Sequence, residues 1–395
     1  MQYAPTVNAV ADHVGKPLSY QVLYGFGGPD GAYPEARLFD VKGTLYGTTA
    51  EGGAHDRGTV FSVTTTGTET VLHSFHANMG KDGRFPYAGL VGVNGTLYGT
   101  TVGGGANGAG TVFSITTAGK EKLLYSFAGG SDGATPYANL INVGGTLYGT
   151  TYYGGTYGNG TVYSITTGGT EKVLYSFGSA SNDGANPKAG LIGVNGTLYG
   201  TTFCGGAYAS GLCYVTMKGT GRGIGGTVFS ITTSGTERVL HSFGNGTDGS
   251  LPAARLLVVG GTLYGTTSAG GAYGGGYGGG TVFSITTGGL ETVLHNFGRG
   301  TDGAHPFAGL INVGNTLYGT TYSGGVKQGF DRHFGTVFSV TTGGAETVLH
   351  NFSGDFSGTD GANPMAGLID VNGTLYGTTP LGGGHDLGTV FSISP

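Results

Sequence analysis

The chain has 395 residues, a formal net charge of −5 and only 10% charged residues. Nucleic-acid binding requires a clustered basic surface, so this composition argues against a nucleic-acid partner. No apolar run approaches the roughly 18 residues of a membrane-spanning helix, and residues 1–16 lack the basic and apolar regions of a signal peptide.

The hexapeptide TLYGTT organises the chain. It recurs at intervals of about 50 to 65 residues, close to the lengths of propeller repeats and above those of solenoids. Each unit continues with a Gly-rich stretch, GTVFSITT, a segment such as EKVLYSF, and the connection DGxxP, and a short apolar run precedes the next TLYGTT. Four short strands with turns between them predict one propeller blade. The seven copies begin at Thr44, Thr96, Thr146, Thr197, Thr262, Thr316 and Thr374.

The two ends of the repeat predict how the ring closes. Residues 18–26 (LSYQVLYGF) match the fourth strand of the other units, and residues 388–395 end the chain on a third strand. We therefore predict an all-β, seven-bladed β-propeller with four antiparallel strands per blade, closed by the N-terminal strand joining the C-terminal blade. Residues 18–395 would form this single domain, and residues 1–17 an N-terminal extension.

The loops differ between the two predicted rims. The turns between first and second strands (VNGT at residues 93–96) and between third and fourth strands (TTGGTE at residues 166–171) are uniform. Successive loops of a meander alternate between rims, so the second-to-third loops share the opposite rim with the blade-to-blade connections. The strong differences between copies lie there, and we predict that this variable rim carries the function.

Two residue types recur too regularly to mark a single active site. An Asp followed by Gly occurs in each DGxxP connection, and we interpret it as a cap for backbone N–H groups; a ring of calcium sites is the alternative. His residues replace Tyr at one fourth-strand position, which indicates interchangeable packing residues. The aspartates are Asp30, Asp82, Asp132, Asp183, Asp248, Asp302 and Asp360, and the histidines are His73, His241, His295 and His350.

The two cysteines both lie in the longest insertion, residues 203–226 of the fourth blade. A pair nine residues apart in an irregular loop predicts a Cys204–Cys213 disulfide and an oxidising compartment. A two-cysteine zinc site is the alternative, and the lack of His in the insertion argues against it.

The LYGTT, GG and GTVF landmarks resemble the GloVer tandem repeat of secreted bacterial proteins, over nearly the whole chain from residue 20 onward. This resemblance implies a propeller-like array and a secreted or cell-surface location. It implies no catalytic motif, so no functional residue is carried over, and the insertion in the fourth blade departs from the repeat.

Titratable residues are concentrated in the variable loops of the sixth, seventh and first units, which are consecutive in a closed ring. We predict that they converge on one arc of the rim, as acid and base with Arg as an anion clamp, or as a divalent metal site. The alternative is that His-Asp before Gly is only a polar turn. No cofactor is certain. The candidate catalytic residues are His55, Asp56, Arg57, Asp331, Arg332, His333, His385 and Asp386.

Aromatic residues occupy the variable loops of the remaining arc. Exposed Tyr with nearby Gly and Asn suits sugar rings, which have apolar faces and hydroxyl edges. Packing of these loops on themselves is the alternative. The candidate substrate-binding residues are Tyr152, Tyr153, Tyr157, Tyr208, Tyr273, Tyr277, Tyr322 and Lys327.

These features predict a secreted, monomeric propeller that binds a polysaccharide or oligosaccharide on its variable rim. The preferred enzyme class is a polysaccharide lyase acting on a uronate-containing glycan, in which Arg57 or Arg332 neutralises the carboxylate while His or Tyr takes the proton α to it. A glycoside hydrolase is less favoured because it needs two carboxylates at a defined separation. The alternative class is a non-catalytic lectin or cell-surface interaction scaffold, which near-identical repeats favour.

Overall fold

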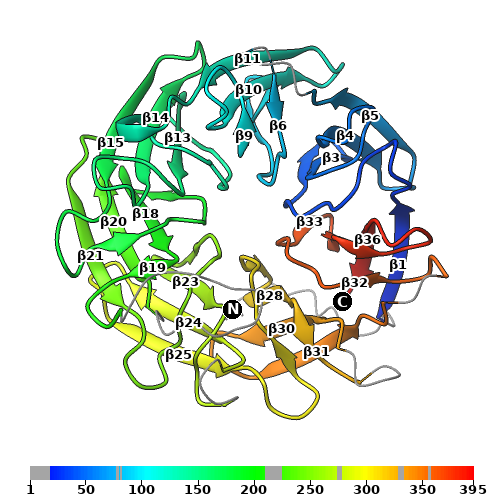
Figure 1. The fold of residues 1–395 in the computed structure, drawn as a ribbon. Helices are drawn as coiled ribbons and strands as arrows, with labels where there is room; N and C mark the ends of the chain where they lie inside the picture. The colour runs from blue at the N-terminus through cyan, green and yellow to red at the C-terminus, as the bar shows by residue number, and fades with distance from the viewer. Residues whose placement is uncertain are drawn as a thin grey trace, which may run out of the picture.

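The computed structural model describes residues 18–76, 80, 82–209, 225–273, 278–327, 333–354 and 357–395. They form a closed ring of seven four-stranded antiparallel sheets around a central axis, which confirms the predicted seven-bladed propeller (Figure 1). Blades are numbered here by the chain order of their innermost strands. These strands are β2 (Phe39–Val41), β7 (Val91–Val93), β12 (Ile141–Val143), β17 (Ile192–Val194), β22 (Leu257–Val259), β27 (Ile311–Val313) and β33 (Ile369–Val371).

The second strand of each blade is the TLYGTT segment, and the third is the GTVF segment. The second strands are β3 (Thr44–Thr49), β8 (Thr96–Thr101), β13 (Thr146–Thr151), β18 (Thr197–Thr202), β23 (Thr262–Thr267), β28 (Thr316–Thr321) and β34 (Thr374–Thr379). The third strands are β4 (Thr59–Thr64), β10 (Thr111–Thr116), β14 (Thr161–Thr166), β20 (Thr227–Thr232), β24 (Thr281–Thr286), β30 (Thr336–Thr341) and β36 (Thr389–Ser394).

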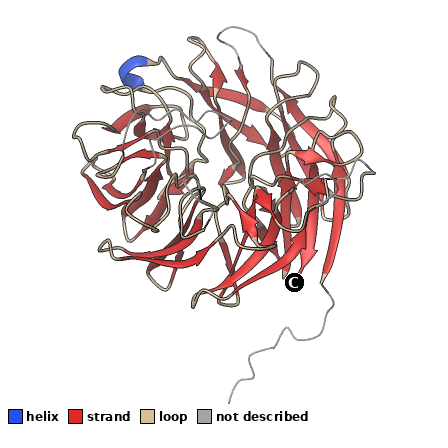
Figure 2. Ribbon diagram, turned by 60° about the horizontal axis from the view of Figure 1, so that its bottom comes forward, coloured by secondary structure: helices blue, strands red, loops and turns tan. Residues whose placement is uncertain are grey.

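The outermost strands are β5 (Glu69–Ser74), β11 (Glu121–Ser126), β15 (Glu171–Ser176), β21 (Glu237–Ser242), β25 (Glu291–Asn296), β31 (Glu346–Asn351) and β1 (Ser19–Gly25). Four two-stranded sheets lie in the loops: β6 (Gly83–Arg84) with β9 (Gly103–Gly104), β16 (Gly184–Ala185) with β19 (Cys204–Gly205), β26 (Gly303–Ala304) with β29 (Ser323–Gly324), and β32 (Gly361–Ala362) with β35 (Leu381–Gly382). Figure 2 shows how strands dominate, with the short 3-10 helix η1 (Gly130–Asp132) in a connection.

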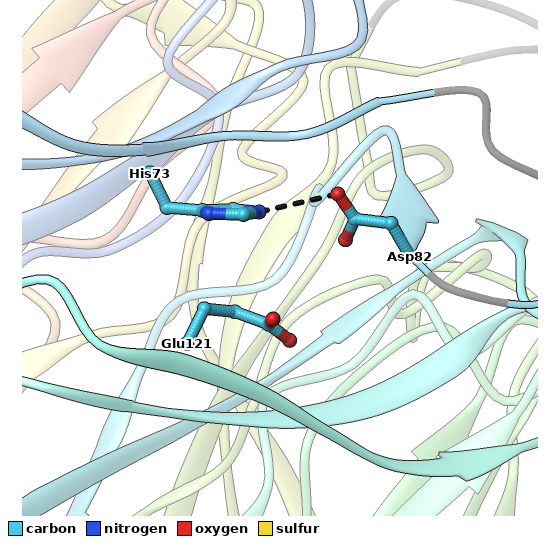
Figure 3. Close-up of side chains that lie close together, drawn as sticks. All are labelled: His73, Asp82 and Glu121. Carbon is cyan, nitrogen blue, oxygen red and sulfur yellow. Dashed lines mark hydrogen bonds and ion pairs between the residues drawn. The ribbon is translucent and has the colours of Figure 1, made fainter.

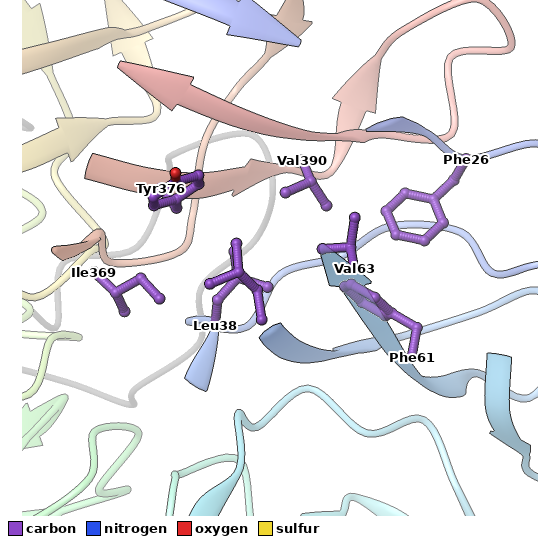
Figure 4. Packing of buried hydrophobic residues seen from close by; sticks show 8 residues of the cluster. Phe26, Leu38, Phe61, Val63, Ile369, Tyr376 and Val390 are labelled. Carbon is purple, nitrogen blue, oxygen red and sulfur yellow. The ribbon is translucent and has the colours of Figure 1, made fainter. Parts of the chain in front are cut away.

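Ring closure follows the sequence prediction. β1 pairs antiparallel with β36, so blade 7 takes its outer strand from the N-terminal part of the chain and the other three from the C-terminal part. Phe26, which follows β1, is 1% exposed and packs between Phe61 of blade 1 and Val390 of blade 7 (Figure 4). The closing strand therefore connects two blades by backbone pairing and by apolar contacts.

The invariance of TLYGTT has a packing explanation. Its Gly lies against the aromatic ring of the facing GTVF strand, and a Cβ at Gly47 would come within 2.5 Å of the Phe61 ring. Its next residue, Thr, donates a hydroxyl hydrogen bond to an Ala carbonyl of the following blade in all seven copies, for example Thr48 to Ala88 at 2.9 Å. The motif therefore joins adjacent blades.

On the variable rim, the residue just before the Pro of each DGxxP connection joins adjacent blades by a hydrogen bond. All seven of these residues have a positive φ of 54° to 59°, and each N–H donates to a carbonyl in the second-to-third loop of the preceding blade. Left-handed backbone is unfavourable for bulky residues such as Tyr and Leu, and the surrounding hydrogen bonds hold it in place. The residues are Tyr33, Phe85, Thr135, Asn186, Leu251, His305 and Asn363.

Candidate functional site

A cavity of about 1980 Å³ runs along the ring axis and is lined by residues from all seven blades. In each blade the chain descends from the variable rim through the segment Pro-x-Ala-x-Leu into the innermost strand. The Ala and Leu side chains are buried between blades, for example Ala36 and Leu38 at 4% and 2% exposure. The residues at the two x positions line the cavity in every blade, except Gly89, because alternate residues of an extended chain point to opposite sides.

The two x positions form two layers of side chains, counted from the variable rim. The first layer consists of Glu35, Tyr87, Tyr137, Lys188, Ala253, Phe307 and Met365, and the second of Arg37, Gly89, Asn139, Gly190, Arg255, Gly309 and Gly367. An extended chain advances about 3.3 Å per residue, so the layers are separated by about 7 Å.

Tyrosines form one wall of the cavity at the first layer. The ring centroids of Tyr87 and Tyr137 are 5.5 Å apart, and Tyr137 lies edge-on to Tyr152 at 5.5 Å. Burial raises the pKa of Tyr87 and of Tyr152 to about 12, so both hydroxyls are neutral donors near pH 7. Such a wall combines flat apolar faces with hydroxyl groups.

Glu35 and Lys188 are the ionisable side chains of the first layer. Burial raises the pKa of Glu35 to about 7, with a further upward effect from Glu51 and an opposing effect from Lys188. Burial lowers the pKa of Lys188, and its Nζ lies 5.8 Å and 5.6 Å from the ring centres of Phe203 and Phe307. A carboxyl group that titrates near pH 7 and interacts electrostatically with an amine of lowered pKa in the same cavity is typical of proton-transfer sites.

Two arginines occupy the second layer. Arg37 Nε donates to the carbonyl of Leu368 at 2.9 Å, and Arg255 Nε donates to the carbonyl of Leu191 at 3.1 Å. Burial lowers the pKa of both guanidinium groups, and the charge of Arg255 lowers that of Arg37 further, to about 10. Two like charges therefore line the same cavity.

The structure places the predicted rim histidines in local contacts. The exposed His55 ring stacks on His76 at a centroid distance of 4.0 Å, and His333 Nδ1 lies 3.1 Å from the Gly325 carbonyl. His385 lies beside Gly27. Among the described residues no hydrogen bond or ring contact joins His55, His333 and His385, and none of the three lines the axial cavity.

Two of the predicted loop carboxylates close their own loops. Asp56 Oδ1 accepts the N–H of Gly52 at 3.1 Å, and Asp386 Oδ1 accepts the N–H of Gly382 at 2.8 Å, each with a positive φ at the Asp. These contacts support the polar-turn interpretation. Arg57 packs over Phe85, 5.5 Å from the ring centre, and Asp331 and Arg332 lie outside the described residues.

The predicted substrate-binding residues divide into two groups. Three of them line the axial cavity: Tyr152, Tyr153 and Tyr322. Four are exposed on the rim and do not line it: Tyr157, Tyr208, Tyr273 and Lys327. Tyr277 lies outside the described residues.

The repeated Asp of each connection accepts a hydrogen bond from the Tyr or His of the preceding outer strand. His73 Nε2 lies 3.3 Å from Asp82 Oδ2, whose carboxylate also accepts the N–H groups of His76 and Gly83. Tyr125 makes the equivalent bond at 2.8 Å to its own Asp. Tyr and His are therefore interchangeable here because both donate to a carboxylate, a more specific role than packing alone.

A Glu from the next blade completes this arrangement at six of the seven blade interfaces. His73 Nε2, one Asp82 oxygen and one Glu121 oxygen lie within 4.8 Å of one another, which is close enough to share a divalent cation (Figure 3). Burial, and then the neighbouring Asp, raise the pKa of Glu121 to about 7, against an opposing effect of His73. Because Tyr replaces His at three interfaces, we interpret the group as structural. The glutamates are Glu69, Glu121, Glu171, Glu237, Glu291 and Glu346.

The insertion of blade 4 is described only at its ends. Cys204 is 1% exposed and begins β19, whereas Cys213 lies outside the described residues, so the disulfide stays a prediction. No helix among the described residues is long and apolar enough to cross a membrane.

Variation among the seven copies indicates the axial site in the sequence. At the two x positions the units differ widely, from Glu, Tyr and Lys to Ala, and from Arg and Asn to Gly, while the Ala between them is invariant. The differences between copies in the second-to-third loops are larger, and they indicated a site on the variable rim instead. Glu35, Arg37, Lys188 and Arg255 were consequently missed as site residues.

The fold and the site thus define a seven-bladed propeller with an axial cavity that carries ionisable groups. The chain belongs to the Gloeobacter/Verrucomicrobia repeat family, whose model matches residues 13–214 and 207–395. No curated protein matches the chain.

Solved structures share the fold at low sequence identity. A quinohemoprotein alcohol dehydrogenase from Comamonas testosteroni has a TM-score of 0.55 at 11% identity, over 95% of this chain and 76% of its own. A putative 6-phosphogluconolactonase from Bacteroides uniformis has a TM-score of 0.52 at 16% identity, over 85% of this chain and 88% of its own. These likenesses establish the propeller fold alone.

Proposed function

We propose that this protein is a secreted, carbohydrate-active propeller that binds a glycan in its axial cavity. The observation that carries the proposal is the tyrosine wall of Tyr87, Tyr137 and Tyr152, which faces a cavity of about 1980 Å³. Aromatic faces bind the apolar faces of sugar rings, and neutral phenol hydroxyls donate to sugar oxygens. The proposed binding site is therefore the axial cavity and not the rim predicted from the sequence. Tyr152, Tyr153 and Tyr322 belong to the predicted set and also line the cavity.

The enzymatic activity that we propose is that of a polysaccharide lyase. Glu35 and Asp370 are the carboxyl groups of the described cavity lining, and Asp370 Oδ1 accepts the N–H of Gly373 in the first-to-second-strand turn of its blade. A hydrolase needs two carboxyl groups across the same glycosidic bond, so this arrangement favours elimination. Elimination needs one base and one acid, which Glu35 and Lys188 supply.

In the proposed elimination, Glu35 is the base and Lys188 is the acid. The ionised Glu35 takes the proton from the carbon α to the sugar carboxylate, and the C–H electron pair forms a carbon–carbon double bond. The glycosidic C–O bond breaks, and its oxygen leaves with the bonding pair and takes a proton from the Lys188 ammonium. Exchange with water returns the proton from Glu35 and recharges Lys188. Since the pKa of Glu35 is about 7, the base form predominates above that pH.

Binding and turnover are tested with a panel of anionic and neutral polysaccharides. Absorbance detects unsaturated lyase products, a reducing-end assay detects hydrolysis, and calorimetry detects binding without turnover. Tyr137→Ala should weaken binding about 5- to 150-fold, because stacking of a ring on an aromatic side chain contributes about 1–3 kcal/mol. Leu290→Ala, a 74% exposed residue, is the control.

Turnover is tested by Glu35→Gln, which removes the base but retains the side-chain shape. Lyase activity should fall at least a hundredfold with little change in binding. Glu121→Gln is the matched control, since its carboxyl group has a similarly raised pKa but lies at a blade interface. Binding without turnover would assign the protein to the lectin alternative, and loss of binding in His55→Ala but not in Tyr137→Ala would return the site to the rim.

A further inference from the structure

We propose that Arg37 and Arg255 form an anion-binding site in the second layer of the cavity, and that its ligand is the carboxylate of an acidic sugar residue. The assignment to a sugar rests on the proposed function. The assignment to an anion rests on the two guanidinium groups alone.

Each guanidinium is held in place but keeps most of its donors free. One N–H of Arg37 is used by the carbonyl of Leu368, and one of Arg255 by the carbonyl of Leu191. In the described part of the chain, neither arginine makes an ion pair or a further hydrogen bond. A guanidinium has five N–H donors in a planar fork that matches a carboxylate, so four on each side chain remain available.

The charges in this layer call for a negative partner. Burial and the charge of Arg255 both lower the pKa of Arg37, yet at about 10 it still leaves the group cationic near pH 7. The carboxyl groups of the described cavity lining lie elsewhere: Glu35 is in the first layer and Asp370 is in a turn. Two unpaired cations in a partly dehydrated site are unfavourable, and an anion between them offsets that free energy.

Glycines leave the space for such a ligand. Four of the seven second-layer positions are Gly, and a Cβ at Gly190 or Gly309 would come within 2.9 Å or 3.0 Å of backbone oxygens of neighbouring blades. A side chain at either position would require the neighbouring blade to shift. The second layer carries no charge besides the two arginines. Their separation from Glu35 by one layer, about 7 Å, suits a sugar whose carboxylate and ring occupy successive layers.

This geometry assigns complementary roles to the two layers. The arginines bind the carboxylate and stabilise the negative charge that develops on it when the α proton leaves, while Glu35 takes that proton. Arg37 and Arg255 are therefore specificity-determining residues, which select acidic over neutral sugars.

The test compares glucuronate, glucose and inorganic sulfate by calorimetry at low ionic strength, where surface screening is small. The variants are Arg37→Gln, Arg255→Gln and the corresponding Lys substitutions, which retain charge but lose the fork. Arg238→Gln, on the outer strand β21, is the matched control. We expect glucuronate and sulfate to bind ten- to a hundredfold more weakly to each Gln variant, with an intermediate loss in the Lys variants.

Each outcome decides between the two proposals. If folded Gln variants bind glucuronate and sulfate as well as the parent, the anion site is refuted; melting temperatures establish that they are folded. If they lose glucose and glucuronate equally, the arginines only tie blades together, and the inference also fails. If the parent binds glucose but neither anion, the inference fails while the proposed function stands. Binding of sulfate without any sugar supports the anion site and refutes the glycan.

Discussion

The glutamates at the blade interfaces should make the stability of this protein fall as pH rises from 5 to 8. Burial, the largest cause, raises the pKa from its ordinary 4.5 to about 7 at five of them, with the neighbouring Asp adding to the effect. The folded protein then binds more protons than the unfolded chain between those values. The stabilisation is therefore full below about pH 4.5 and is lost as pH rises through 7.

The magnitude follows from the half-buried state of these side chains. A shift of 2.5 pKa units corresponds to about 3.4 kcal/mol for an isolated group, and solvent screening reduces it to about 1 kcal/mol. Five such groups would contribute about 5 kcal/mol, or about 6 °C in melting temperature for a chain of this length. The groups facing Glu121 are His73 and Asp82. Against the effect of burial, the hydrogen bond and charge of His350 lower the pKa of Asp360, so this group stabilises the fold above the ordinary pKa of Asp and loses that contribution in acid.

Calorimetric melting temperatures at pH 5, 6, 7 and 8 and constant ionic strength provide the measurement. Glu121→Gln replaces the carboxyl group with a neutral isostere, so its melting temperature should match the parent at pH 5 and exceed it by about 1 °C at pH 8. Substituting all six glutamates with Gln should remove most of the dependence, and Glu35, whose pKa is also raised to about 7, should account for the remainder. A parent that melts at the same temperature at pH 5 and pH 8 would refute the reasoning.

Two further predictions concern the closure and the insertion. Deleting residues 1–26 removes β1 and the buried Phe26, exposing the edge of β36; we expect loss of cooperative unfolding or aggregation, detected by calorimetry and light scattering, and a truncated protein that melts like the parent would contradict this. The predicted Cys204–Cys213 disulfide closes a loop of about ten residues and should contribute about 2–3 kcal/mol locally. Reduction should increase proteolysis of the insertion without unfolding the ring, and two free thiols in air-oxidised protein would rule it out.

The sequence by itself determined the ring. Each TLYGTT copy determines pairing within its blade, because its Gly accommodates the aromatic ring of the facing strand. It also determines packing between blades, because the Thr after that Gly donates a hydrogen bond to the next blade. The truncated units at the two ends determined the closure for the same reason: each lacked strands that only the other could supply.

The position of the candidate site was decided by the tertiary structure. His55 and His385 lie in loops of similar sequence, and the sequence predicted that they converge. In the structure His55 stacks on His76 and His385 lies beside Gly27, because the blade geometry around the axis decides the distance between loops. Glu35 and Lys188 belong to different blades far apart in the chain, and only the curvature of the ring brings their x positions to one axial layer. Periodicity reveals which residues occupy equivalent positions, whereas closure of the ring decides which of them face one another.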